Sequence, residues 1–535
     1  MKIQSSQQAA FEHLLNISIQ LSNEEDTDLL MEKILLAAVE VSNADAGSIY
    51  LVNEQQELEF RTIYNKSLDL HLGGSSSSAI NFPGIPLVVD NKPNCSAIVA
   101  HAANTGEVVN IDDVYTTLPF DFSAARTMDR KTGYRTKSML TFPLKDHIGD
   151  IIGVIQLINA MDGTEIVSFS KQIEQQILSF AALGAIALTN RALISNMEQL
   201  FESFAKTIAA AIDKKSAHTG GHCKRVPELT LMFADAVSDY EDGPLASFKL
   251  TPEDRHQLNI AGWLHDCGKI ATPDHVMEKS KKLETIFDRI HFVTAKLEIV
   301  KRDIDLKYQA AMICALQANK AVRVEQLDRE RILAQKQLKL DTAFLQKTNV
   351  GGEFLTDEQA SNILAIAERY QITIENIAQP LLTEDEILNL SIKRGTLNDK
   401  ERDIIKQHMD VTLDILNALP FPKHLANVAE FALGHHEKMD GTGYPRGLVK
   451  AQMSVPSRLM ALADIFEALS AADRPYKSAK PVSECLKIMS NLVKNNHLDP
   501  DLFVIFVRSK VYEKYIHKFA DPNQLDDFDI ETLLN

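Results

Sequence analysis

The spacing of apolar and polar residues changes its period along the first third of the chain. Residues 27–43 carry apolar side chains at helical spacing, which predicts an amphipathic helix. Shorter stretches in which apolar and polar residues alternate predict strands of one antiparallel sheet at 47–53, 57–64, 138–144 and 151–159. The Gly- and Ser-rich residues 73–78 predict a flexible loop. Residues 1–190 therefore predict an α+β domain in which helices flank an antiparallel sheet.

Helical spacing then continues without a clear stop over residues 168–213. Its apolar positions still recur at intervals of three and four near the end, as at Phe201 and Phe204. A helix of about 45 residues would extend about 65 Å, which is longer than one globule usually accommodates. We therefore expect a parallel dimeric connector between two domains. The alternative is a helix that breaks near Asn190 or Asn196 and packs within one chain.

The pattern after residue 213 is almost entirely helical. Residues 283–347 lack proline and are rich in Lys, Glu, Gln, Leu and Ala, which predicts a helical hairpin with its turn near residues 317–319. The predicted fold class is therefore multidomain: an N-terminal α+β domain, a long connecting helix and a C-terminal all-α domain. With an N-terminal helix or tail and a C-terminal tail added, the expected segments are 1–22, 23–167, 168–213, 214–520 and 521–535.

Composition narrows the functional classes. A chain of 535 residues is long enough for two to four domains. Its 73 acidic and 56 basic residues give a net charge of −17, which argues against a nucleic-acid or anionic-membrane binder. No uncharged apolar run reaches the ~20 residues of a membrane span, and no signal peptide is evident. The five cysteines are scattered without a CxxC pair, so we expect a cytoplasmic protein with reduced thiols.

Candidate chemistry is concentrated in histidines and aspartates of the helical half. They occur at His218, His222, His265, Asp266, His408, His435, His436 and Asp464. Neutral imidazole and carboxylate bind divalent first-row metals, and two such ions can clamp a phosphate. Each histidine alone is better explained as a surface or core residue. Adjacent pairs within apolar helices, however, are both useful only where several helices converge.

Two motifs in this half resemble a known enzyme family. The segment LHDCGK has the H-D-x-G-K form of the HD metal-dependent phosphohydrolases. The segment HHEKMDGTGYP has the longer form of the HD-GYP subfamily, whose members resemble cyclic di-GMP phosphodiesterases. The later segment DIFEALSAADRPYK is also similar to the family, and the resemblance covers about residues 205–520.

The resemblance implies two divalent metal ions, with Fe or Mn expected. One ion would be held by His222, His265, Asp266 and Asp464, and the other by His408, His435 and His436, with Asp266 bridging. Asp266 and Lys269 are the implied catalytic residues, Lys269 offering a positive charge to the scissile phosphate. The substrate phosphates would contact Arg474 and Lys477. Lys438 and Arg446 add to this local positive field, which the net charge conceals.

The signature loop of the second motif is associated in the family with site shaping and with partner contacts, including GGDEF-type proteins. Its residues here are Glu437, Asp440, Gly441, Gly443, Tyr444 and Pro445. We interpret Glu437 and Asp440 as residues that order the loop and the ligating histidines rather than as metal ligands.

The chain departs from the family at two places. Some members have a Glu four residues before the first ligand histidine, where it supports a third metal, and that position is His218 here. His218 is therefore a candidate third-metal ligand, with a surface histidine as the equal alternative. Residues 279–390 form a helical insertion far longer than is typical. A dimer contact, a regulatory surface and a solvated decoration remain open for it.

Residues 23–190 resemble a GAF sensory domain, on the order of their predicted elements and the pieces TGYRTKSML and GVIQLIN. Cyclic-nucleotide-binding members carry an N-K…F-x-x-x-D-E signature. Here Asn159 is followed by Ala160, and Ile173–Glu174 follows Phe169, so the Lys and Asp of that signature are missing. The GAF ligand is therefore left unknown.

These observations lead to one main functional hypothesis. The chain would be a GAF-regulated phosphodiesterase that hydrolyses cyclic di-GMP to pGpG, and further to GMP as an open possibility. It would act as a homodimer through the connecting helix and the GAF domain, without nucleic acid or membrane. The alternatives are a hydrolase of another cyclic dinucleotide, such as cyclic GMP-AMP, and a catalytically silent cyclic di-GMP receptor.

Overall fold

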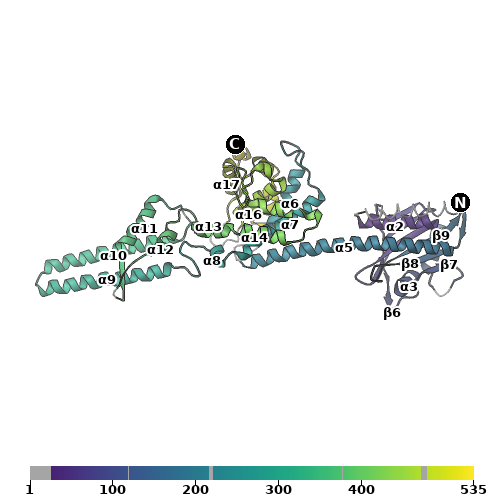
Figure 1. Cartoon of the computed structure of the whole chain (residues 1–535), viewed down its shortest axis with the longest axis horizontal. Coiled ribbons are helices and arrows are strands. Elements are labelled where there is room, and N and C mark those ends of the chain that lie inside the picture. Colours follow the sequence, from purple (N-terminus) through teal and green to yellow (C-terminus); the bar gives the residue numbers. More distant parts are fainter. Residues whose placement is uncertain are drawn as a thin grey trace. The chain divides into compact units, whose positions relative to one another are not determined.

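A computed structural model describes residues 24, 26–76, 78–117, 120–215, 221–352, 354–375, 377–471 and 479–534. The chain divides into two compact units, Met1–Leu200 and Phe201–Asn535. The predicted fold class is confirmed: an antiparallel α+β domain, a long helix and an all-helical domain follow one another (Figure 1). The expected tail at residues 1–22 lies outside the described residues.

The N-terminal domain is built on one antiparallel sheet with the strand order β3-β2-β1-β9-β8-β7. The four predicted strands are confirmed as β1, β2, β8 and β9. The remaining strands lie at the sheet edges or form short hairpins. The strands are β1 (Ala44–Val52), β2 (Glu57–Asn65), β3 (Leu70–Gly73), β4 (Ile85–Pro86), β5 (Val88–Val89), β6 (Lys92–Pro93), β7 (Val109–Ile111), β8 (Met139–Lys145), β9 (Ile151–Asp162) and β10 (Glu165–Val167). Gly73 ends β3, so the predicted loop at 73–78 begins one residue later than expected.

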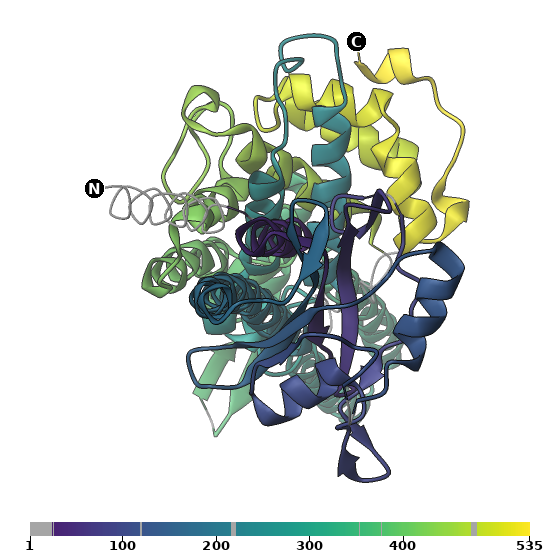
Figure 2. The ribbon, with the colours of Figure 1, turned by 90° about the vertical axis from the view of Figure 1, so that its right-hand side faces the viewer.

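Helices cover both faces of this sheet, as Figure 2 shows with the domain toward the viewer. They are α2 (Thr27–Ser42), α3 (Ile98–Thr105), α4 (Ser123–Thr132) and the start of α5 (Lys171–Lys215). The Asp26 carboxylate caps α2 by accepting a 2.9 Å hydrogen bond from the Leu29 amide. Side chains alternate along β1, so Ile49 packs in the core with α2 and α5 whereas Tyr50 packs on the opposite face with α3.

Helix α5 is continuous over 45 residues, so the predicted alternative of a break near Asn190 or Asn196 is wrong. Among the described helices, α5 is long and apolar enough to cross a membrane, with an 18-residue window of mean hydropathy 1.7. Its first turns are nevertheless buried in the N-terminal core, at Phe180 and Ala185. Its last turns are buried in the second unit, at Ala205. Protein cores therefore cover both ends of this helix.

The second unit packs short helices around one large apolar core that includes Phe233, Phe466 and Tyr515. Its elements before the insertion are α6 (His222–Ser238), α7 (Pro252–Leu264), η1 (Cys267–Ala271) and α8 (Asp274–Met277). Those after it are α13 (Asp399–Lys406), α14 (His408–Ala418), η2 (Lys423–Leu425), α15 (Val428–Leu433), η3 (Gly434–His436), η4 (Lys450–Gln452), α16 (Val455–Ser470), α17 (Val482–Lys494), α18 (Pro500–Arg508), α19 (Val511–Phe519), η5 (Pro522–Gln524) and α20 (Ile530–Leu534). The expected C-terminal tail includes α20, whose Leu533 packs against the core.

The insertion forms a small subdomain with a separate apolar core that includes Val293, Leu345 and Ile363. Its two long helices lie side by side as the predicted hairpin (Figure 1). The elements are α9 (Ile290–Gln317), α10 (Ala321–Asn349), α11 (Asp357–Arg369), β11 (Gln371–Ile374), β12 (Ile377–Pro380) and α12 (Glu384–Leu390). The β11–β12 hairpin was not predicted. Polar and apolar residues alternate in Gln371–Ile374, but only over four residues, and Ile377–Pro380 shows no alternation and is exposed.

Candidate metal centre

The candidate ligands come from elements that are far apart in the sequence and meet in the second unit. His222 is the first residue of α6, and His408 is the first residue of α14. His265 ends α7 and Asp266 leads into η1, so the chain turns sharply at this adjacent pair. Short η3 carries His435 and His436, and α16 carries Asp464 in its middle.

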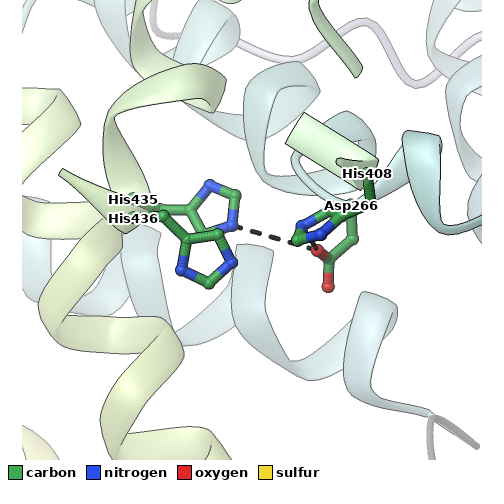
Figure 3. A group of neighbouring side chains, drawn as sticks. All are labelled: Asp266, His408, His435 and His436. Carbon is green, nitrogen blue, oxygen red and sulfur yellow. Dashed lines mark ion pairs between the residues drawn. The ribbon is translucent and has the colours of Figure 1, made fainter. Parts of the chain in front are cut away.

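The two carboxylate oxygens of Asp266 face two different groups of histidines. Asp266 Oδ2 lies 3.4 Å from His222 Nε2 and 3.2 Å from His265 Nε2. Asp266 Oδ1 lies 3.3 Å from His408 Nε2 and 3.9 Å from His435 Nε2. Figure 3 shows the second group, with the His435 and His436 rings facing Asp266 and His408. One carboxylate thus stands between two sets of potential ligands.

The remaining two candidate ligands complete these sets. His436 offers a nitrogen to the group of Asp266, His408 and His435, whose ligand atoms all lie within 4.8 Å of one another. Asp464 joins the other side, because its Oδ1 lies 3.3 Å from His222 Nε2. The structure therefore brings together all seven of the expected ligands of the two metals.

Backbone carbonyls fix the orientation of three of the imidazole rings. The Nδ1 atoms of His265 and His435 each lie 2.6 Å from the carbonyl oxygen three residues earlier, and His408 Nδ1 contacts its own such carbonyl. A carbonyl can only accept, so each Nδ1 carries a proton, and Nε2 is the nitrogen left to bind a metal. The rings are thereby oriented with Nε2 toward the site before any metal binds.

Buried atoms without partners make this site fit a cation. Asp266 Oδ1 and the Nε2 atoms of His265, His408 and His435 have no hydrogen-bond partner among the described residues. All four atoms are acceptors once Nδ1 carries the proton, so they cannot satisfy one another. Burying unpaired acceptors is costly, and a divalent ion would satisfy several of them together. The HD-type site is therefore a candidate divalent-metal site.

The electrostatics of the centre depend on Asp266 and Lys269. Burial would raise the pKa of Asp266, but Lys269 and His265 hold that pKa well below its usual range. Lys269 Nζ donates a 2.6 Å hydrogen bond to Asp266 Oδ2. Burial lowers the pKa of Lys269, yet the Asp266 carboxylate outweighs this effect and raises it. Lys269 therefore keeps its positive charge beside the ligands.

The histidines on the two sides differ in their protonation. Burial lowers the pKa of His435 to about 4, with the nearby His265 adding to the effect. Burial also opposes the charged form of His222, but hydrogen bonds with Asp266, Asp464 and Glu467 outweigh it and raise the pKa of His222. A metal at the His222 side would therefore compete with a proton.

Gly268 sets the distance between the two halves of the site. A Cβ atom at this position would lie 1.9 Å from the His408 carbonyl oxygen, so only glycine fits. The Gly268 amide also donates a 3.0 Å hydrogen bond to Thr412 Oγ1 on α14. This contact holds the turn carrying Asp266 against the start of the helix carrying His408.

The signature loop is ordered by carboxylates of its own. Glu437 is buried, and it accepts hydrogen bonds from the amides of Arg446 at 2.7 Å and Leu448 at 2.9 Å. The exposed Asp440 accepts a hydrogen bond from the Thr442 amide at 2.9 Å, a contact within the loop itself. The Tyr444 ring stacks on His436, with ring centroids 4.8 Å apart.

Three further loop positions were singled out in the sequence. Gly441 has a φ of 80°, which favours glycine. A Cβ atom at Gly443 would come within 2.5 Å of the Glu437 Cα atom, so the loop folds tightly onto the residue that orders it. Pro445 follows Tyr444 through a cis peptide bond.

Three expected site residues cannot be located. His218, Arg474 and Lys477 lie outside the described residues. The structure also adds two residues that the sequence reasoning missed. Glu467 Oε2 lies 2.5 Å from His222 Nδ1, and Arg225 Nε donates a 2.7 Å hydrogen bond to Glu467 Oε1. Glu467 lies three positions after Asp464 on α16, and this i, i+3 spacing is the signal that would have placed both carboxylates on one helix face.

Comparison with protein families agrees with this organisation. The chain matches the GAF domain family over residues 26–212. It matches the HD domain family over residues 219–339 and again over residues 361–502. The protein therefore carries an N-terminal GAF domain and a C-terminal HD domain.

Curated relatives of known activity are similar to parts of the chain. It is 40% identical over 129 residues to the 3'3'-cGAMP-specific phosphodiesterase 1 of Vibrio cholerae, covering 24% of this chain and 28% of that protein. It is 37% identical over 125 residues to a cyclic di-GMP phosphodiesterase of Pseudomonas aeruginosa, covering 23% of this chain and 28% of that protein. Each match thus spans less than a third of the relative.

Among solved structures, the GAF domain of an Acinetobacter phosphoenolpyruvate-protein phosphotransferase aligns with 35% of this chain and 98% of its own length. The sequence identity is 14% and the TM-score is 0.26.

Proposed function

We propose that the protein is a metal-dependent phosphodiesterase that hydrolyses a cyclic dinucleotide. The observation that carries this proposal is the position of Asp266, whose two oxygens face two separate groups of histidines. When bound there, a pair of divalent ions supplies positive charge for a phosphate and lowers the pKa of an attacking water. The similarity to cyclic di-GMP and cGAMP phosphodiesterases supports a cyclic dinucleotide as the phosphate ester.

The protein's own residues prepare this site in three ways. Asp266 stays ionised, because its pKa is held low, and it keeps the two ligand groups together. Lys269 keeps its charge beside them and offers it to the anionic phosphate. The stacked Tyr444 covers the ring of His436 and restricts its orientation. We assign the catalytic roles to Asp266 and Lys269.

The preferred substrate is cyclic di-GMP, with pGpG as the first product and GMP as the product of a second cleavage. Arg474 and Lys477 would contact its phosphates. Fe or Mn are the expected metals, because imidazole and carboxylate ligands suit both. A third ion at His218 is a further part of this proposal.

The substrate is tested with purified, metal-loaded full-length protein. Cyclic di-GMP and 3'3'-cGAMP are supplied separately under reducing conditions, and products are separated by chromatography. Faster loss of cyclic di-GMP with release of pGpG supports the preferred substrate. Faster loss of 3'3'-cGAMP would assign the second candidate, which the 40% identity to a cGAMP-specific enzyme favours. Binding without turnover of either would leave the silent receptor.

The connecting helix is proposed to form a parallel homodimer. Along α5, Leu193, Met197 and Leu200 are 52%, 50% and 71% exposed, and they recur at intervals of four and three. Both ends of α5 are packed in protein cores, which supports a second copy of the chain rather than lipid as the cover of this stripe. We infer a cytoplasmic protein in which the ligand state of the GAF domain reaches the HD domain through α5.

The signature loop is proposed as a second contact surface, for GGDEF-type proteins. Its segment from Gly441 to Lys450 keeps exposed side chains at Thr442, Arg446 and Val449. Glu437 fixes the backbone beneath them through the two hydrogen bonds it accepts from this segment. A pull-down with the loop substitution Arg446→Glu tests this surface, and unchanged capture of the partner would reject it.

A further inference from the structure

The GAF domain contains a cavity of about 390 Å³ on the sheet face opposite α2 and α5. Strands β1, β2, β8 and β9 form its floor, and α3, α4 and the segment before α4 cover it. This volume falls within the range of small-molecule sites in proteins. It lies wholly within the N-terminal unit and uses none of the residues of the metal centre.

Aromatic rings lead from the floor of the cavity to its opening. Tyr50 is 3% exposed, and its ring centroid lies 4.5 Å from that of Phe60. The Phe60 centroid lies 5.4 Å from that of Phe82, which also lines the cavity and is 43% exposed. Such a series of rings offers stacking and edge contacts to a planar ligand.

At the floor, Tyr50 has a side-chain hydrogen bond with Ser48, but Tyr50 and Gln156 bond only weakly to each other. The Tyr50 hydroxyl lies 3.5 Å from Gln156 Oε1, at the outer limit of a hydrogen bond. The Gln156 amide nitrogen donates to Thr141 Oγ1 at 3.3 Å and contacts the Met139 sulfur at 3.2 Å. Both side chains are buried, so a ligand with a polar edge would gain better hydrogen bonds than the protein supplies.

The charged side chains that line the cavity are of one sign. No Lys, Arg or His is present among the described residues that line it, whereas two aspartates are. Asp129 is already satisfied, because it accepts hydrogen bonds from the Tyr115 hydroxyl at 2.7 Å and from the Thr136 amide and hydroxyl at 2.9 Å. Asp121 is exposed at the opening, and hydrogen bonds from Ser123 lower its pKa and keep it ionised.

An anionic ligand would therefore be poorly accommodated. Its charge would lose hydration on entry, would find no cation in this lining and would face Asp121 and Asp129. Asn159 is the first residue of the signature for cyclic-nucleotide binding, and its side chain is already hydrogen-bonded to the protein backbone. Its amide nitrogen donates to the Arg135 carbonyl and its oxygen accepts from the Lys137 amide, both at 2.7 Å.

We propose that this cavity binds a small planar aromatic molecule that is uncharged or cationic, and that it rejects anions such as cyclic nucleotides. The ring would stack within the Tyr50–Phe60–Phe82 series, its polar edge would meet Gln156, and a positive group would reach Asp121. The proposal concerns the GAF domain alone, so it stands whether or not the HD domain is a phosphodiesterase.

Three matched probes test the charge preference on the full-length protein. Indole is uncharged, tryptamine adds an ammonium group, and indole-3-propionate adds a carboxylate to the same ring. Ligand-observed NMR titration at millimolar concentration is expected to rank tryptamine first and indole second. It should place indole-3-propionate at least about tenfold below tryptamine, since one charge interaction of about 1.4 kcal/mol gives that factor.

Two substitutions locate the binding. Ala125 on α4 lines the cavity, so Ala125→Trp fills it and should abolish binding of all three probes. The matched control Ala343→Trp lies at an exposed position of α10 and should leave binding unchanged. Asp121→Asn should weaken the binding of tryptamine but not the binding of indole. This second test does not require the cavity to be filled.

Three results would overturn the proposal. They are absence of binding by indole and tryptamine, equal binding of indole-3-propionate and tryptamine, and retained binding in a folded Ala125→Trp protein. Circular dichroism of each variant establishes that it is folded.

Discussion

His222 Nδ1 lies 2.5 Å from Oε2 of Glu467, on the opposite side of the imidazole ring from the Nε2 atom that faces Asp266. Glu467 is 1% exposed and is held in turn by Arg225. A carboxylate in this position fixes the tautomer and orientation of a ligand histidine and increases its basicity. His222 thus differs from His265, His408 and His435, whose Nδ1 atoms contact backbone carbonyls.

Replacing Glu467 by glutamine should weaken metal binding while the ligands themselves stay in place. Loss of a carboxylate behind a ligand histidine typically costs about 10–100-fold in metal affinity. Competition titration of the metal-free protein with a chromophoric chelator measures this constant. Glu484→Gln on α17 is the matched control, because Glu484 pairs with the nearby Lys480 and no candidate ligand histidine is among its partners in the described residues. Equal affinities for the two variants would show that Glu467 does not support the site.

Gly268→Ala should separate the two halves of the centre. The new Cβ atom would need the space 1.9 Å from the His408 carbonyl oxygen, so η1 and α14 must move apart. Metal content should fall, and the melting temperature should drop by several degrees for a loss of about 1–3 kcal/mol. Gly352→Ala is the control, because nothing lies within 4 Å of its Cβ position. A Gly268→Ala protein with full metal content and unchanged melting temperature would contradict this role.

The sequence singled out the candidate ligands that the structure brings together, but it did not predict how these side chains are held. Adjacent residues such as His265–Asp266 carry a recognisable pattern because metal chemistry limits which side chains can occupy them. The role of Glu467 depends instead on the close packing of α16 against α6, a tertiary contact that local spacing does not specify. The sequence likewise did not predict that α6 begins at His222 and α14 at His408, because neither helix start has a side-chain cap.

In the fold, too, elements with a local sequence pattern were predicted and features that depend on tertiary contacts were not. Strong alternation or helical spacing predicted the main strands of the sheet and the continuous α5, because their buried faces impose a period on the sequence. The hairpin β11–β12 has almost no buried face, and its alternation is limited to the four residues Gln371–Ile374, which is too short to identify a strand. The cavity of the GAF domain arises where Tyr50, Phe60 and Gln156 meet from three strands, which no single stretch of sequence records.

Lys282 should make the stability of the protein depend on pH. Its side chain is buried, with one 3.0 Å hydrogen bond to the Leu390 carbonyl, and burial lowers its pKa to about 8. Between that value and the ordinary 10.5, the unfolded chain holds a proton that the folded chain has lost. The free energy of unfolding should therefore rise with pH across this window, by up to about 3 kcal/mol in total. Below pH 8 the buried charged amine destabilises the folded chain by an amount that no longer changes with pH.

Lys282→Met removes this titration and should stabilise the protein at pH 7, where the wild type still buries the charged amine. Urea denaturation of both proteins across the window measures the difference, with the exposed Lys301→Met as control. If the wild type and Lys282→Met keep the same difference in unfolding free energy from pH 7 to pH 10, the burial of an uncompensated amine is refuted.

The dimer proposed for α5 is expected to depend on its exposed apolar stripe. Replacing Leu193 and Leu200 by glutamate places like charges along the seam and should convert the dimer to a monomer in light scattering coupled to size exclusion. Gln199→Glu adds one charge at an exposed position of the same stretch of helix, on a face turned away from the stripe, and should leave the dimer intact. A wild-type monomer at working concentration would remove the basis of signalling through α5.

The bridging position of Asp266 is tested most directly by Asp266→Asn, which keeps the shape of the side chain and removes its charge. Metal content and cyclic dinucleotide turnover are measured on the same anaerobic preparations of wild type and variant. We predict about two divalent ions per wild-type chain with turnover, and loss of both in a folded Asp266→Asn protein. A variant that keeps two ions and hydrolyses the substrate at the wild-type rate would contradict the central claim.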